Sequence, residues 1–169
     1  MKPKIQTTIT YGIIAIAIAL AISQGTVTAH GQAPDRSLGG VWLVTITPRN
    51  CATGAPTTAA FEALFTFHND GTMLVSLRNN SLTLERTASH GLWGRDRGWN
   101  HYSFKFIHIR REVSTGAFAG KQESGGALVL SDSGDEFTTD GSTSGFDANG
   151  NPGPGGCSTS AGTRFQFES

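Results

Sequence analysis

The amino-acid sequence predicts an all-β protein, an antiparallel up-and-down barrel of about eight strands. Most of the chain consists of short runs in which apolar and polar residues alternate, the period of a half-buried strand. The runs are separated by turn sequences such as Asn69-Asp70-Gly71, a hairpin signal. No segment has the length and period of a long helix. Strands joined mainly by short turns favour a barrel, because closure removes free edges.

The N-terminus has the pattern of a secretory signal peptide. Lys2 and Lys4 precede an apolar run over residues 13–22, and small residues follow up to Ala29 and Ala33. The run is shorter than the roughly 20 residues of a membrane span. We therefore expect a secreted or periplasmic protein with no membrane span after cleavage. Residues 1–29 form the signal peptide, with cleavage as late as residue 33, residues 30–39 a flexible lead-in, and residues 40–169 a single barrel domain.

Charge gives no indication of a nucleic-acid partner. The chain has 13 basic and 13 acidic residues, and loss of Lys2 and Lys4 leaves 11 against 13. No basic patch or stripe is visible, so we expect no nucleic-acid binding. The pair Arg110-Arg111 ends an alternating run and is interpreted as a solvated strand end.

The first predicted strand covers residues 41–47, and the second covers residues 59–67. The second begins with good helix formers, but the hairpin turn at residues 68–71 favours a strand leading into another at residues 72–77. The further predicted strands are 86–95, 101–111, 116–122 with 127–131 as one bent strand or two, 136–146 and 163–167. Gly91 and Gly94 would mark a bulge or sharp bend, and residues 147–156 form a long loop.

The predicted strand over residues 101–111 has the clearest alternation. It places Tyr102, Phe104, Phe106 and His108 on one face. Together with Phe61, Phe65, Phe67 and Trp93, these residues are candidates to line a ligand cavity. Simple core packing is the alternative, because an eight-stranded barrel is either filled by side chains or holds one small ligand.

Cys51 and Cys157 are the only two cysteines. Export would place them in an oxidising compartment, where a disulfide is expected, with two buried thiols as the alternative. Cys51 follows the first predicted strand and Cys157 precedes the last, so a bridge would clamp the seam that closes the barrel. If the two cysteines face each other in an unbroken register, Trp42 faces Gln166 and lies diagonal to Arg164.

The same register would give the seam an apolar outer face. Val41, Leu43, Phe165 and Phe167 would share one side while Trp42 points to the other. Either a bulge intervenes or something covers this face. A homo-oligomer formed through the apolar outer seam is therefore one expectation.

The motif Gly40-Val41-Trp42, with Arg164 near the C-terminus, resembles the calycins, above all the lipocalins. Lipocalins are secreted eight-stranded barrels in which a basic residue near the last strand stacks on the Trp of Gly-x-Trp. The resemblance implies a structural cation–π contact between Arg164 and Trp42 at the closed end of a barrel. The chain departs from lipocalins in lacking their mid-chain signature and a clear C-terminal helix. The phrases NCATGAP, SHGLWGR and DEFTTDG also resemble exported bacterial proteins of undescribed function.

Catalytic and metal-binding motifs are absent from the sequence. None of the five histidines belongs to a His-Glu-x-x-His motif, and no Gly-x-Ser-x-Gly elbow occurs. The catalytic candidates are His108, and His90 with Glu85 as an acid–base pair if the fold joins them. Asp147-x-Asn149-x-Asn151 resembles the start of a calcium loop but has Pro152 where glycine is required. We expect no metal and no cofactor.

These observations predict an exported barrel that binds a small apolar ligand without catalysis. An alternative is a cyclase or isomerase that guides an apolar substrate in a comparable cavity, like the allene-oxide-cyclase and dirigent barrels. A second alternative is a filled barrel that acts as an envelope or adhesion module, which an apolar outer seam would favour.

Overall fold

The computed structural model describes residues 37–78 and 81–166. The predicted signal peptide, both cleavage positions, His30 and Phe167 lie outside these ranges. In the described ranges, no helix has the length and apolar character needed to cross a membrane.

The described chain is built from nine β-strands. They are β1 Gly40–Arg49, β2 Phe61–Phe67, β3 Thr72–Leu77, β4 Leu84–Arg86, β5 Ser89–Arg97, β6 His101–Glu112, β7 Phe118–Leu130, β8 Glu136–Phe146 and β9 Gly156–Arg164. All pairings between neighbouring strands are antiparallel. The prediction of a strand rather than a helix at residues 59–67 is therefore confirmed.

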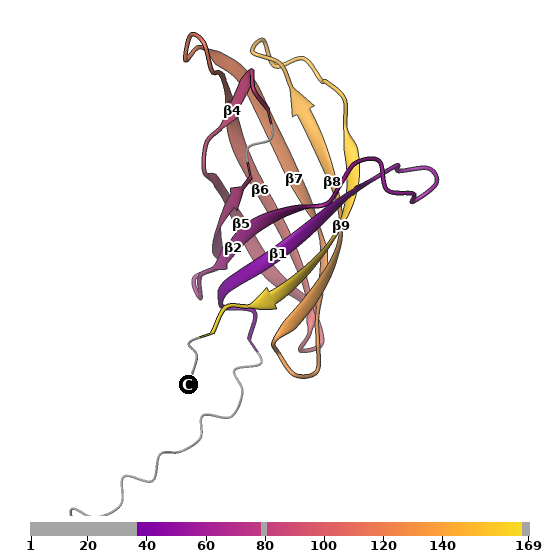
Figure 1. The fold of residues 1–169 in the computed structure, drawn as a ribbon. Helices are drawn as coiled ribbons and strands as arrows, with labels where there is room; N and C mark the ends of the chain where they lie inside the picture. The colour runs from indigo at the N-terminus through magenta and orange to yellow at the C-terminus, as the bar shows by residue number, and fades with distance from the viewer. Residues whose placement is uncertain (1–36, 79–80, 167–169) are drawn as a thin grey trace, which may run out of the picture. The chain divides into compact units, whose positions relative to one another are not determined.

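The strands close into an eight-stranded barrel (Figure 1). Strands that follow each other in sequence are paired, except around β4. Here β3 pairs with β5, and β4 and β5 both pair with β6, along successive parts of it. The β6–β7 and β1–β9 pairings complete the ring. The predicted fold class, a calycin-like barrel with its first and last strands paired, is confirmed.

Several details of the strands differ from the predictions. Of the two alternatives left open for residues 116–131, the structure has the single strand, because β7 continues through Gly125 and Gly126. The bulge in β5 lies between Arg95 and Arg97 rather than at Gly91 or Gly94. The last strand begins at Gly156, seven residues before its predicted start, and β1 continues through Pro48. β9 escaped prediction because its sequence GCSTSAGTR is rich in small polar residues and has no apolar alternation.

A disulfide between Cys51 and Cys157 clamps the β1–β9 seam, as predicted. The register differs by two residues from the predicted one, because Cys157 lies opposite Arg49 and Cys51 lies beyond the end of β1. Trp42 consequently lies directly opposite Arg164. The expected diagonal placement was therefore wrong.

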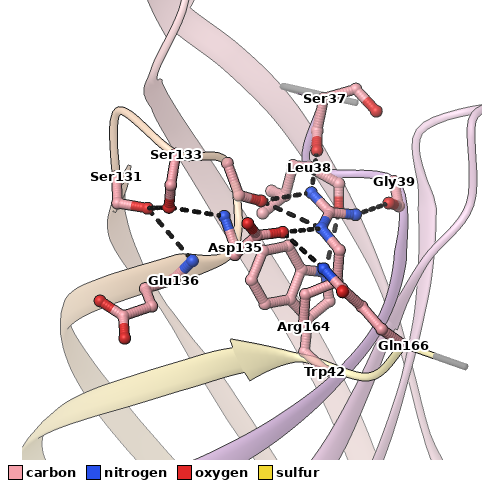
Figure 2. A network of polar contacts seen from close by, with 11 residues as sticks. Ser37, Leu38, Gly39, Trp42, Ser131, Ser133, Asp135, Glu136, Arg164 and Gln166 are labelled. Atoms are coloured by element: carbon pink, nitrogen blue, oxygen red, sulfur yellow. Dashed lines mark hydrogen bonds and ion pairs between the residues drawn. The ribbon is translucent and has the colours of Figure 1, made fainter. Parts of the chain in front are cut away.

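Arg164 seals the closed end of the barrel over Trp42 (Figure 2). Its guanidinium carbon lies 4.3 Å from the centroid of the Trp42 ring. The Nη atoms donate to the carbonyl oxygens of Ser37, Gly39 and Gly134 at 2.6–2.7 Å. Gly40 has a φ of 126°, and a Cβ there would lie 3.1 Å from Arg164 Nη1. The glycine of the Gly-x-Trp motif thus admits both the backbone turn and the guanidinium.

The last residues of the predicted lead-in belong to this closed end. Leu38 is fully buried, and its carbonyl oxygen accepts a hydrogen bond from Trp42 Nε1 at 3.0 Å. Residues 37–39 are therefore docked on the barrel, whereas the sequence placed them in a flexible segment.

The closed half of the barrel is filled with side chains. Trp42 packs against Phe137 with ring centroids 4.9 Å apart. The other buried residues of the closed half include Phe67, Met73, Tyr102, Leu128 and Leu130. A Cβ on Gly162 would overlap the Phe137 ring, so this glycine makes room for the aromatic core. The interior is consequently solid at this end.

The outer face carries exposed apolar side chains. Leu43, Leu64, Leu74 and Leu92 extend outward from β1, β2, β3 and β5. Phe165, just past β9, is also exposed. The apolar outer face expected at the seam is present in the described chain, and the expectation of a homo-oligomer stays a prediction.

Candidate functional site

The open half of the barrel contains a cavity of about 260 Å³. It lies at the opposite end of the interior from Arg164, where β1 ends and where β2 and β9 begin. One wall is apolar and mainly aromatic. Its members are Ile46, Phe61, Phe65, Leu77, Phe104 and Phe106.

The opposite wall is polar and comes from β7, β8 and β9. Ser124 and Thr143 face each other across β7 and β8, and their hydroxyls lie 2.9 Å apart. Thr139, Ser158 and Ser160 also line the cavity. Because these side chains are short, the interior stays hollow here while the aromatic residues fill the other half.

Arg86 introduces a positive charge into the cavity. It lines the wall from β4 and lies directly opposite Arg110 of β6. Burial, and then the charge of Arg110, lower the pKa of Arg86. Arg110 Nη2 donates to the Phe146 carbonyl oxygen at 2.7 Å, whereas its buried Nε has no hydrogen-bond partner among the described residues. The prediction of a solvated strand end at Arg110-Arg111 was therefore wrong for Arg110, which is half-buried and hydrogen-bonded, whereas Arg111 is exposed.

His108 lies in the barrel wall beside this pair of arginines. It is 2% exposed, and its partner across β7 is Gln122. Burial, then the charge of Arg86 and to a lesser extent that of Arg110, lowers the pKa of His108 to about 4, and Gln122 opposes this shift. Neither ring nitrogen of His108 forms a hydrogen bond with any of the described residues. The imidazole is therefore neutral at pH 7.

Stability is expected to fall between pH 7 and pH 4 because of His108. Its folded pKa of about 4 lies below the value of about 6.5 in an unfolded chain, so the unfolded state takes up the proton first as the pH falls. At roughly 1.4 kcal/mol per pKa unit, the free energy of unfolding should decrease by on the order of 2–3 kcal/mol. Urea unfolding at the two pH values measures this decrease.

The substitution His108→Gln should remove this part of the decrease, because glutamine does not titrate. His90→Gln is the matched control, since His90 is exposed on β5 and should leave the decrease intact. Carboxylates such as Glu123, whose pKa Lys105 and Lys121 hold at about 2, titrate in every variant and cancel in the comparison. An equal decrease in the free energy of unfolding in His108→Gln and in the unchanged protein would contradict the assignment of this pH dependence to His108.

The structure divides the predicted cavity residues into three groups. Phe61, Phe65, Phe104 and Phe106 line the cavity. Phe67, Trp93 and Tyr102 pack in the closed half, where Phe67 and Trp93 have ring centroids 5.7 Å apart. His108 is buried next to the cavity-lining residues Arg86 and Gln122 rather than at the surface of the cavity.

The predicted acid–base candidates are not brought together. His90 is exposed and pairs with Ile107, while Glu85 is exposed and pairs with Arg111. No Asp or Glu lines the cavity in the part of the chain that the structure describes. His108 therefore lies among cations and an amide rather than beside an acid.

Sequence reasoning missed Arg86, Gln122 and the hydroxyl wall. A signal for Arg110 was available, because it lies two residues after His108 and so shares its inward face. Arg86 gave no such signal, since β4 is only three residues long.

The carboxylate of Asp147 accepts hydrogen bonds from residues of its own loop. Asp147 Oδ1 accepts from the backbone N–H groups of Asn149 and Asn151 at 2.9 and 2.8 Å, and Oδ2 accepts from Asn151 Nδ2 at 2.9 Å. These hydrogen bonds lower the pKa of Asp147 and stabilise a tight Asx turn. Across residues 37–78 and 81–166, no group of three or more His, Cys, Asp or Glu side chains could hold a metal ion.

Comparison with known proteins adds no family assignment. No protein-family model matches the chain, and a sequence search of curated proteins finds no match.

Proposed function

We propose that the barrel binds a small apolar molecule in the open half of its interior, without catalysis. The observation that carries the proposal is the cavity of about 260 Å³ with an aromatic wall. Its volume lies just below the usual range of ligand sites, roughly 300–1,000 Å³, which suits a small ligand. Arg164 stacks on Trp42 and closes one end of the barrel, as the resemblance of Gly40-Val41-Trp42 and Arg164 to lipocalins implied. The cavity lies at the other end, and this arrangement supports the same function.

The side chains around the cavity favour binding over acid–base chemistry. General acid–base catalysis needs a group with a pKa near the working pH, within reach of the substrate. The low pKa of His108 leaves its ring uncharged at pH 7 and far from the pKa that a general acid or base needs there. Export to an oxidising compartment belongs to the proposal, and the Cys51–Cys157 disulfide supports it.

Blocking the cavity tests the proposal. Gly156 lines the cavity, and a Cβ built there meets no atom within 4 Å. The substitution Gly156→Leu should therefore fill space without a backbone clash. We expect 1-octanol to bind the unchanged protein and Gly156→Leu to weaken binding by about tenfold or more, measured by calorimetry.

Gly94→Leu is the matched control. Gly94 is an exposed strand glycine at which an added Cβ also meets nothing within 4 Å, and it lies away from the cavity. This variant should bind 1-octanol like the unchanged protein. Absence of 1-octanol binding to the unchanged protein, or equal affinities in Gly156→Leu and Gly94→Leu, would overturn the proposal.

A further inference from the structure

Two like charges lie side by side at the cavity. Arg86 and Arg110 are direct partners across β4 and β6. Like charges placed directly opposite each other destabilise a sheet, and partial burial increases the cost because the guanidinium groups lose water. Such a pair calls for a compensating anion.

The protein supplies no such anion within the described ranges. The ion pairs there join Lys105 and Lys121 to Glu123, and Arg164 to Asp135. Glu85, next to Arg86 in sequence, is exposed and lies opposite Arg111. Arg86 itself has neither a carboxylate nor a carbonyl partner in this part of the chain. One face of the cavity is therefore positive and uncompensated.

We infer that the natural ligand is an amphiphilic carboxylic acid, whose carboxylate is held by Arg86 and whose apolar part lies against the aromatic wall. This inference rests on the proposed ligand-binding function. The planar guanidinium of Arg86 can donate two parallel hydrogen bonds to a carboxylate. Gln122, which also lines the cavity, adds amide donors beside it. Arg110, which lies opposite Arg86 on β6, adds a second positive charge.

The aromatic wall sets the orientation of the ligand. Phe61, Phe104 and Phe106 line the same cavity as Arg86. A molecule with its acid at Arg86 can therefore bury its apolar part against these rings. The hydroxyls of Ser124 and Thr143 share one hydrogen bond and carry no charge. Arg86 is the one cation among the described residues that line the cavity, so it is the main attraction for an anion.

His108 reports the position of the acid. The charges of Arg86 and Arg110 contribute to its low pKa, and Gln122 is its other polar neighbour. A carboxylate beside Arg86 offsets these positive charges, so the pKa of His108 should rise when the acid binds. A neutral ligand in the same cavity offers no such compensation.

The test compares octanoate with 1-octanol, which share a chain and differ in the head group. At pH 7 we expect octanoate to bind the unchanged protein about 10–100-fold more tightly than 1-octanol. Arg86→Gln should remove that advantage, so that octanoate and 1-octanol bind this variant with similar affinities. Arg111→Gln, at the exposed neighbouring position of Arg110, should alter neither affinity by more than about twofold.

A histidine titration by NMR on the unchanged protein supplies a second measurement that needs no variant. The pKa of His108 should rise with saturating octanoate and stay constant with saturating 1-octanol. Equal affinities for the two probes, unaltered octanoate binding in Arg86→Gln, or an unmoved His108 would each overturn the inference. If 1-octanol still binds in those cases, the proposed function stands; if neither probe binds the unchanged protein, both fall.

Discussion

Replacing Trp42 with alanine is expected to lower the free energy of unfolding by about 3–5 kcal/mol. Trp42 is fully buried, and its ring packs between Phe137 and the Arg164 guanidinium. The substitution would open a void at the closed end and leave the Leu38 carbonyl oxygen without its hydrogen bond from Nε1. Urea unfolding followed by circular dichroism measures the loss.

Trp99→Ala is the comparison for this prediction. Trp99 is 38% exposed, so its removal leaves no enclosed void and should cost much less. Similar losses in the two variants would show that the contact between Trp42 and Arg164 does not hold the closed end together.

The second large effect is expected from the double substitution Cys51→Ser and Cys157→Ser. The disulfide joins residues separated by 106 positions. For a loop of that length, the chain-entropy treatment gives a stabilisation of about 4–5 kcal/mol. The free energy of unfolding of the double variant, measured under the same conditions, should fall by roughly that amount.

Reduction of the unchanged protein provides the control for the disulfide. Treatment with a thiol reductant should shift its unfolding midpoint toward that of the double variant, and the double variant should not respond. The β1–β9 ladder pairs eight residues on each strand besides the bridge, so the reduced barrel should still close. A double variant as stable as the unchanged protein would contradict a clamping role.

Much of the fold could be predicted because local pattern and tertiary position agree. On β6, Tyr102, Phe106 and His108 are buried as the alternation indicated. In the last strand, β9, the local sequence pattern did not indicate the tertiary position. Ser158 and Ser160 point into a hollow part of the barrel, where no apolar side chain is needed, so β9 has the composition of a loop. Pairing with β1 and β8 makes it a strand.

The candidate site was only half visible in the sequence. Phe61, Phe65, Phe104 and Phe106 could be selected because aromatic residues on inward faces gather in a barrel interior. Their separation from Phe67 and Tyr102 depends on how far along the barrel each residue lies, which periodicity does not give. Arg86 and Arg110 are 24 positions apart in the sequence, and they meet only because β4 pairs with β6. No local pattern predicts that pairing.

Mapping octanoate on the protein by amide NMR is the most direct test of ligand binding in the open half of the barrel. The largest shifts should occur at Arg86, Gln122 and Ser124, around the cavity, with small changes at the closed end near Trp42. Shifts confined to the outer apolar residues Leu43, Leu64 and Leu74 would contradict it.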